Sequence, residues 1–102
     1  MATIKFTTPL PNAMYKNGDS ITFVAQAIST AMMHGYDLAI RKVGEPSNIY
    51  FIHVHNHNDT LDIIEKWKSE VVAVPASLEA EIAVYIDHEN HTKKEKIRFV
   101  IQ

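Results

Sequence analysis

Hydrophobic side chains recur at every second position along most of this chain, which is the spacing of β-strands that bury one face. Residues 20–30 and 34–43 show the alternation most clearly. A continuous β-rich run covers residues 49–56, and turn-forming residues such as Gly44 and Pro46 lie between the runs. We therefore predict short strands at residues 3–8, 20–30, 34–43, 49–56, 60–66, 78–87 and 94–101.

One window of the chain fits two secondary structures. In residues 60–70, Leu61, Ile64 and Trp67 would share one face of a helix. Leu61 and Ile63 also alternate as in a strand, and the β-rich surroundings favour that interpretation.

About seven short strands separated by turns predict an all-β domain, an antiparallel β-sandwich with immunoglobulin-like strand order. The chain has no cysteine, so the disulfide of antibody domains is absent and a fibronectin-type sandwich is the nearer analogue. No linker or repeat divides the sequence, and we expect one domain over residues 1–102.

Charge and length narrow the classes of partner. Lys and Arg number 10 against 12 Asp and Glu, giving a formal net charge of −2, so no basic surplus would attract nucleic acid. No apolar run approaches the roughly 20 residues that a membrane-spanning helix needs. The absence of cysteine also excludes thiolate metal sites and cysteine catalysis. We expect a monomeric or weakly associating domain.

The six histidines fall into three short groups, far apart in the sequence: His34 alone, then His53, His55 and His57, then His88 and His91. In the predicted strand order, the first group begins a strand, the second ends the neighbouring antiparallel strand, and the third lies in the last turn. Antiparallel topology sends all three places to the same end of a sandwich. We therefore expect the histidines to converge at one pole.

Neutral imidazole is the commonest protein ligand for transition metals, and alternate side chains of one strand share a face. The pattern thus favours a zinc or copper site. The predicted ligands are His34, His53, His55, His57, Asp87, His88 and His91. An alternative interpretation assigns these histidines to surface loops and to hydrogen-bonded core positions, with His34 fixing the turn before Gly35.

The sequence gives weaker support for catalysis and for the binding of carbohydrate or protein. No serine stands in a nucleophile-elbow context and no His-Glu-X-X-His helix occurs, so we predict no catalytic residues and no enzyme activity. A surface module that binds carbohydrate or protein is the second hypothesis, because Tyr36 and Trp67 could stack on a sugar or a peptide. Packing of Trp67 in the core is the alternative to that role.

Four segments together resemble a family of small, uncharacterised exported lipoprotein domains from Bacteroidetes: His34-Gly-Tyr36, His53-Val-His-Asn-His57, Trp67 and Asp87-His-Glu-Asn-His91. The resemblance spans nearly the whole chain. It implies a periplasmic or surface-anchored domain and no established activity. The chain shows neither a leader nor a lipid-attached cysteine, so we expect that a leader has been removed.

Overall fold

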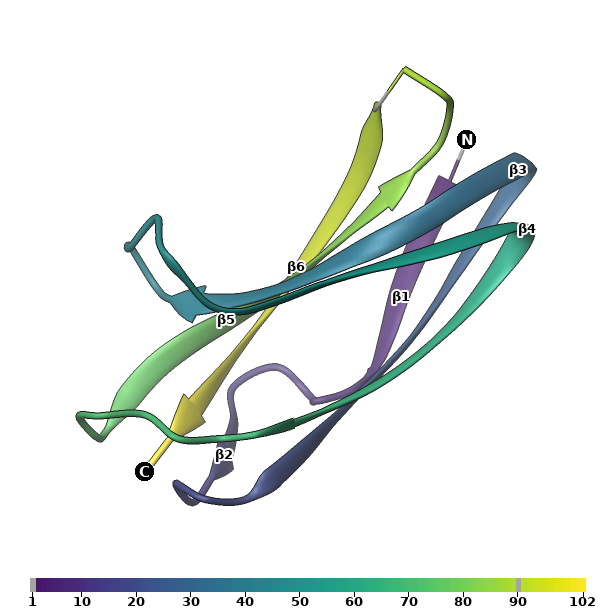
Figure 1. Cartoon of the computed structure of the whole chain (residues 1–102). Coiled ribbons are helices and arrows are strands. Elements are labelled where there is room, and N and C mark those ends of the chain that lie inside the picture. The colour runs from purple at the N-terminus through teal and green to yellow at the C-terminus, as the bar shows by residue number, and fades with distance from the viewer. Residues whose placement is uncertain (1, 90) are drawn as a thin grey trace.

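The computed structural model describes residues 2–89 and 91–102, and it is all-β, which confirms the predicted class (Figure 1). Its strands are β1 (Ala2–Thr8), β2 (Ala13–Tyr15), β3 (Ser20–Lys42), β4 (Asn48–Lys68), β5 (Ala76–Tyr85) and β6 (Thr92–Ile101). The window that also fits a helix lies almost entirely in β4, as a strand. Within the described ranges, no helix has the length and apolarity to cross a membrane.

The prediction of about seven separate strands was wrong in detail, because two predicted pairs are fused into long bent strands. Residues 20–30 and 34–43 are the halves of β3, and residues 49–56 and 60–66 are the halves of β4. Residues 30–34 contain no Gly or Pro that would end a strand. Residues 56–59, expected as a turn, stay in β4, where Asn58 pairs with Met33. The short strand β2 lies in a segment that turn-forming residues predicted as a loop.

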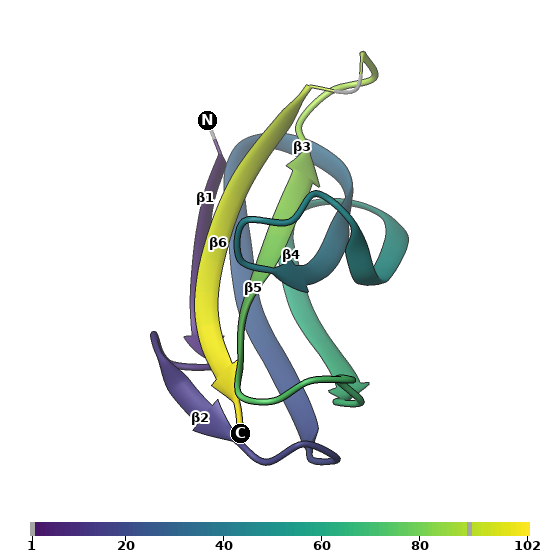
Figure 2. The ribbon, with the colours of Figure 1, turned by 90° about the vertical axis from the view of Figure 1, so that its left-hand side faces the viewer.

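The six strands form one mixed sheet in the order β1–β3–β5–β6–β2, with β4 also paired to β3. All pairs are antiparallel except β2 with β6. Because β3 and β4 double back at their bends, the sheet curls into a half-barrel whose two halves face each other (Figure 2). The immunoglobulin-like sandwich stays a prediction at this level.

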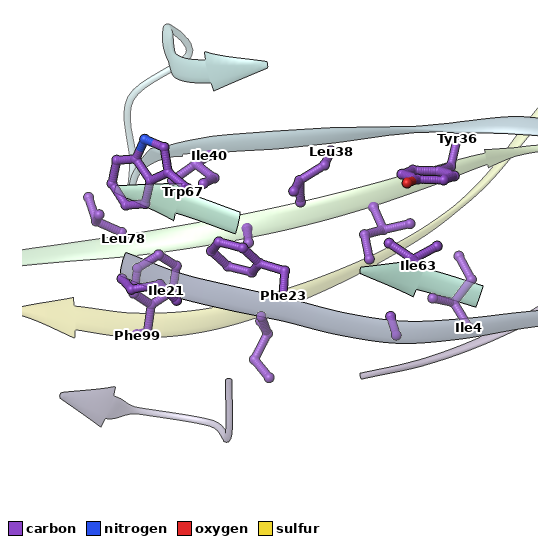
Figure 3. Close-up of a cluster of buried hydrophobic side chains, with 14 of the residues drawn as sticks. Ile4, Ile21, Phe23, Tyr36, Leu38, Ile40, Ile63, Trp67, Leu78 and Phe99 are labelled. Carbon is purple, nitrogen blue, oxygen red and sulfur yellow. The ribbon is translucent and has the colours of Figure 1, made fainter. Parts of the chain in front are cut away.

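The core fills the space between the two halves of the curl. Ile21 and Phe23, from the first half of β3, point toward Leu38 and Ile40 of its second half (Figure 3). Phe23, Leu38 and Ile40 are fully buried. Burying a side chain of this size is worth about 1.5–3 kcal/mol, so the core holds the bent strands against each other. The ends of the curl are thereby fixed in place, and one of them carries the histidines.

Candidate metal centre

The bends of β3 and β4 and the β5–β6 turn meet at one end of the molecule, at the upper right and top of Figure 1. We call this end the histidine pole. It holds a pocket of about 230 Å³ lined by His34, His53, His55, His57, Tyr85, Asp87 and His88. The structure therefore brings together five of the six histidines and the one carboxylate that the sequence predicted as a shared site.

Gly35 allows the strands to bend at this pole. Its φ is +136°, a conformation that favours glycine, and a Cβ at this position would lie 2.2 Å from the carbonyl oxygen of Val54. The β3–β4 pairing is irregular here, with register shifts on both sides of Met33. Close backbone approach at Gly35 places His34 in the pocket beside the bend of β4.

Imidazole rings from three chain segments are in contact at the pole. The ring centroid of His34 lies 4.1 Å from that of His88, in the β5–β6 turn, and 4.8 Å from that of His57 in β4. The centroid of His55 lies 4.5 Å from that of His57. The four imidazoles of this cluster place several ring nitrogens in one small volume.

His34 carries the clearest sign of an incomplete polar environment. Its Nδ1 atom is buried and has no hydrogen-bond partner among residues 2–89 and 91–102. Burial lowers the pKa of His34, and the nearby His88 and His57 lower it further, while Asp87 acts in the opposite direction. The neutral ring, the form that binds metal ions, is therefore favoured at this position.

His55 and His57 direct the same ring atom at each other. Their Nε2 atoms are 2.8 Å apart, a hydrogen-bond distance in which one ring donates its N–H to the other. Alternate residues of a strand share a face, so the pair lies side by side at the edge of the pocket.

A carboxylate and a tyrosine orient His53. The Nδ1 atom of His53 lies 2.6 Å from Oδ1 of Asp37, and the hydroxyl of Tyr85 donates to Oδ2 of the same carboxylate at 2.6 Å. Because the carboxylate only accepts, Nδ1 of His53 carries a proton, which leaves Nε2 as the acceptor of the neutral ring. The bond to Asp37 and burial raise the pKa of Tyr85.

His91 stands apart from the pocket, although it lies at the same pole. Its Nδ1 atom bonds Oδ2 of Asp87 at 2.5 Å, and the backbone N–H groups of Glu89 and His91 donate to Oδ1. The hydrogen bond from the His91 ring holds the pKa of Asp87 below its usual range. Asp87 thus stabilises the β5–β6 turn and has little lone-pair capacity left for a ligand.

The two aromatic residues predicted to bind a ligand are buried. Tyr36 is 4% exposed and donates a hydrogen bond to the carboxylate of Glu65, and burial with this bond raises its pKa. Trp67 is 9% exposed and packs edge-on against Phe99. Neither residue lines the histidine pocket.

Asp37 and Tyr85 were not predicted as parts of the metal site. Asp37 pairs with His53 across the β3–β4 ladder, and Gly35 pairs with both His55 and Tyr85. Strand parity places Asp37 on the outer face. Only the register, which the sequence does not reveal, brings it opposite His53.

Within residues 2–89 and 91–102, no three His, Asp or Glu side chains already surround one point closely enough to hold a metal ion. Metal binding would therefore require rotation of the rings. Comparison of the chain with family models and with curated proteins found no match.

Proposed function

We propose that this protein binds a transition-metal ion in the histidine pocket. The observation that carries the proposal is that the ring of His34 contacts those of both His57 and His88, from two other segments, while its own buried Nδ1 atom has no partner among the described residues. An unpaired buried polar atom costs about 1–3 kcal/mol, and a metal–nitrogen bond would remove that cost. His53, held by Asp37, resembles the carboxylate-oriented histidines of known metal sites.

The test is titration of metal-free protein with copper(II) and with zinc, followed by calorimetry and by NMR of the histidine side chains. We expect one-to-one binding with a submicromolar Kd that shifts His34, His57 and His88 together. His91→Asn is the matched control, because His91 lies at the same pole outside the pocket, and it should leave the Kd unchanged. Weak binding at several sites, confined to His53, His55 and His57, would contradict the proposal.

We also propose a fold type and a cellular location for this protein. The neighbours β1–β3–β4 in one half of the sheet and β4–β3–β5–β6 in the other support an immunoglobulin-like order, with the bent strands joining two layers. The resemblance to exported lipoprotein domains supports a role in handling or sensing the metal in the periplasm or at the cell surface. Fractionation of cells that express the full-length gene would test this localisation.

An exposed aromatic residue favours a second candidate function, a surface module that binds carbohydrate or protein. Phe51 of β4 is 52% exposed and borders a hollow that Arg41, Asn48 and Lys94 also line. Sugar rings stack on such faces. NMR titration with oligosaccharides, comparing the native protein with Phe51→Ala, would test this; shifts that persist in the variant would argue against Phe51 as the contact.

A further inference from the structure

We propose that two copies of this chain pair edge to edge through the second half of β4, residues 60–68, around a twofold axis at Ile64. The partner that this edge fits is therefore a second copy of the protein. The proposal does not depend on a metal, because residues 60–68 do not line the histidine pocket. A weak dimer of this kind falls within the expectation of a monomeric or weakly associating domain.

One edge of this half of β4 has no partner strand. Residues 60–68 pair with residues 20–28 of β3 in an unbroken antiparallel register. In the part of the chain that the structure describes, no strand pairs with the opposite edge of β4 (Figure 2). Such an edge presents a row of backbone N–H and C=O groups, which is a template for another strand. No proline or bulge interrupts it over residues 60–68, so a second strand would fit without rearrangement.

The side chains on the outer face of residues 60–68 are self-complementary. Asp62, Ile64 and Lys66 are exposed and occupy alternate positions, so they share this face. In an antiparallel pair centred on Ile64, this residue meets its own copy, and each Asp62 lies opposite Lys66 of the second copy. A shift of the axis by one residue in either direction would place Ile64 opposite a charged residue. Charge complementarity therefore selects the register centred on Ile64.

Ile64 and its charged neighbours have contact capacity left for a partner. The side chain of Ile64 is 63% exposed, and it lies opposite Val24 in β3, so pairing would extend this contact into an apolar stripe across both copies. Asp62 accepts a bond from Gln26 through one oxygen only, at 2.8 Å. Within the described residues, Lys66 forms no ion pair. Apolar pairs and opposite charges across strands both stabilise a sheet.

The edges of β1 and β6 do not have this property. Lys5 is exposed at the centre of β1, where it would lie opposite its own copy. On β6, Lys94, Lys96 and Arg98 are exposed at alternate positions and present one sign of charge. Like charges directly opposite each other destabilise strand pairing. These two edges therefore resist a second copy, whereas the second half of β4 fits one.

Sedimentation equilibrium in the presence of EDTA measures the association without metal bridges between histidines. We expect a monomer–dimer equilibrium with a Kd below about 1 mM that weakens as salt is added. Lys66→Asp and Asp62→Lys should each weaken the dimer by about tenfold or more, because like charges then face each other at both ion pairs. The double variant Asp62→Lys/Lys66→Asp restores opposite charges and should recover the affinity.

Phe51→Lys is the matched control. Phe51 is 52% exposed in the first half of the same strand, and its substitution should leave the Kd unchanged. All of these positions are exposed, so the variants should fold, and circular dichroism would confirm this. A protein that stays monomeric at about 1 mM would overturn the proposal, as would a dimer that the double variant fails to restore. A dimer weakened by Phe51→Lys and not by the charge reversals would overturn it in favour of the first half of β4.

Discussion

The two ends, or poles, of the curled sheet differ in whether their buried polar side chains have hydrogen-bond partners. At the pole away from the histidines, Ser69 is fully buried, and its hydroxyl accepts from the N–H of Gly18 at 3.1 Å and donates to the carbonyl of Asp19 at 3.0 Å. Asn17 donates to the carbonyl of Val71 at 2.8 Å and accepts from its N–H at 2.9 Å. These side chains complete the backbone hydrogen bonds of the loops that they connect.

At the histidine pole, in contrast, imidazole rings contact other imidazole rings. Of the buried side-chain nitrogen and oxygen atoms in residues 2–89 and 91–102, Nδ1 of His34 is the one without a partner. Buried polar groups in proteins are nearly always paired, and an exception in a pocket is a reason to look for a ligand. At the first pole these polar side chains are thus hydrogen-bonded within the protein, whereas at the histidine pole one buried ring nitrogen has no partner among the described residues.

The largest effect on the free energy of unfolding is expected at Gly35. The backbone of the histidine pole can adopt its conformation there because glycine has no side chain. Gly35→Ala should cost roughly 3 kcal/mol in the free energy of unfolding, because the methyl group meets the carbonyl oxygen of Val54 at a φ that alanine disfavours. Urea unfolding would measure it. Gly44→Ala is the control: its φ is +85° but no atom lies within 4 Å of the added Cβ, so about 1–2 kcal/mol is expected. Equal losses would show that steric contact at Gly35 is unimportant.

Removal of the amide at the opposite pole should have the next largest effect. Asn17→Ala leaves the N–H and the carbonyl of Val71 without their partner, and it should destabilise the fold by roughly 2 kcal/mol. Asn58→Ala removes an exposed amide whose one backbone bond, to Thr60 at 3.3 Å, is long; it should change the free energy of unfolding by less than about 0.5 kcal/mol. If the two variants are equally stable, the hydrogen bonds of Asn17 do not distinguish this pole.

Much of the fold was predictable from alternation. Phe23, Leu38 and Ile82 are apolar positions of the alternating pattern in the predicted strands, and all three are fully buried. The convergence of the histidines was also predictable, since it depends on strand order and not on strand ends. Strand boundaries were harder to predict, because β3 and β4 continue as strands through their bends with shifts in register, and residues 30–34 contain no Gly or Pro that would signal a turn.

The details of the candidate site were harder to predict. The partner of His53 is Asp37, which is 16 residues away and lies opposite only in one register. The exclusion of His91 from the pocket follows from its bond to Asp87 within a tight turn. The sequence shows which metal-binding side chains are present, and the strand register determines which of them lie together in the site.

A cluster of charged residues in the sheet, away from the histidine pole, provides a pH test. Glu79 is 6% exposed and contacts Arg41 at 3.0 Å and Lys96 at 3.4 Å. Burial alone would raise the pKa of Glu79, but the bonds from Arg41 and Lys96 and their charges outweigh it and lower the pKa. The folded state therefore binds this proton less readily than the unfolded state, and the stabilisation is present above the unfolded pKa and lost as pH falls through the folded pKa.

Metal-free protein should accordingly lose stability as the pH falls below the ordinary pKa of a glutamate, about 4.3. Glu79→Gln should cost roughly 1 kcal/mol at neutral pH and should flatten this part of the profile. Unfolding by urea at each pH measures both. An unchanged profile in Glu79→Gln would assign the acid sensitivity to other carboxylates.

The substitution with the smallest expected effect on stability, His34→Phe, distinguishes the roles of the two poles most clearly. His34→Phe keeps a ring of similar shape and removes the unpartnered Nδ1 atom, so it should leave the metal-free protein unchanged or stabilise it by up to about 1 kcal/mol. The same substitution should abolish the rise in Tm that we expect copper(II) or zinc to give the native protein, since a ligand that binds only the folded state stabilises it more as its affinity increases. His91→Asn should keep that rise. A loss in His34→Phe as large as in Asn17→Ala would mean that His34 is a structural residue, and the two poles would then differ only in the chemistry of their hydrogen bonds.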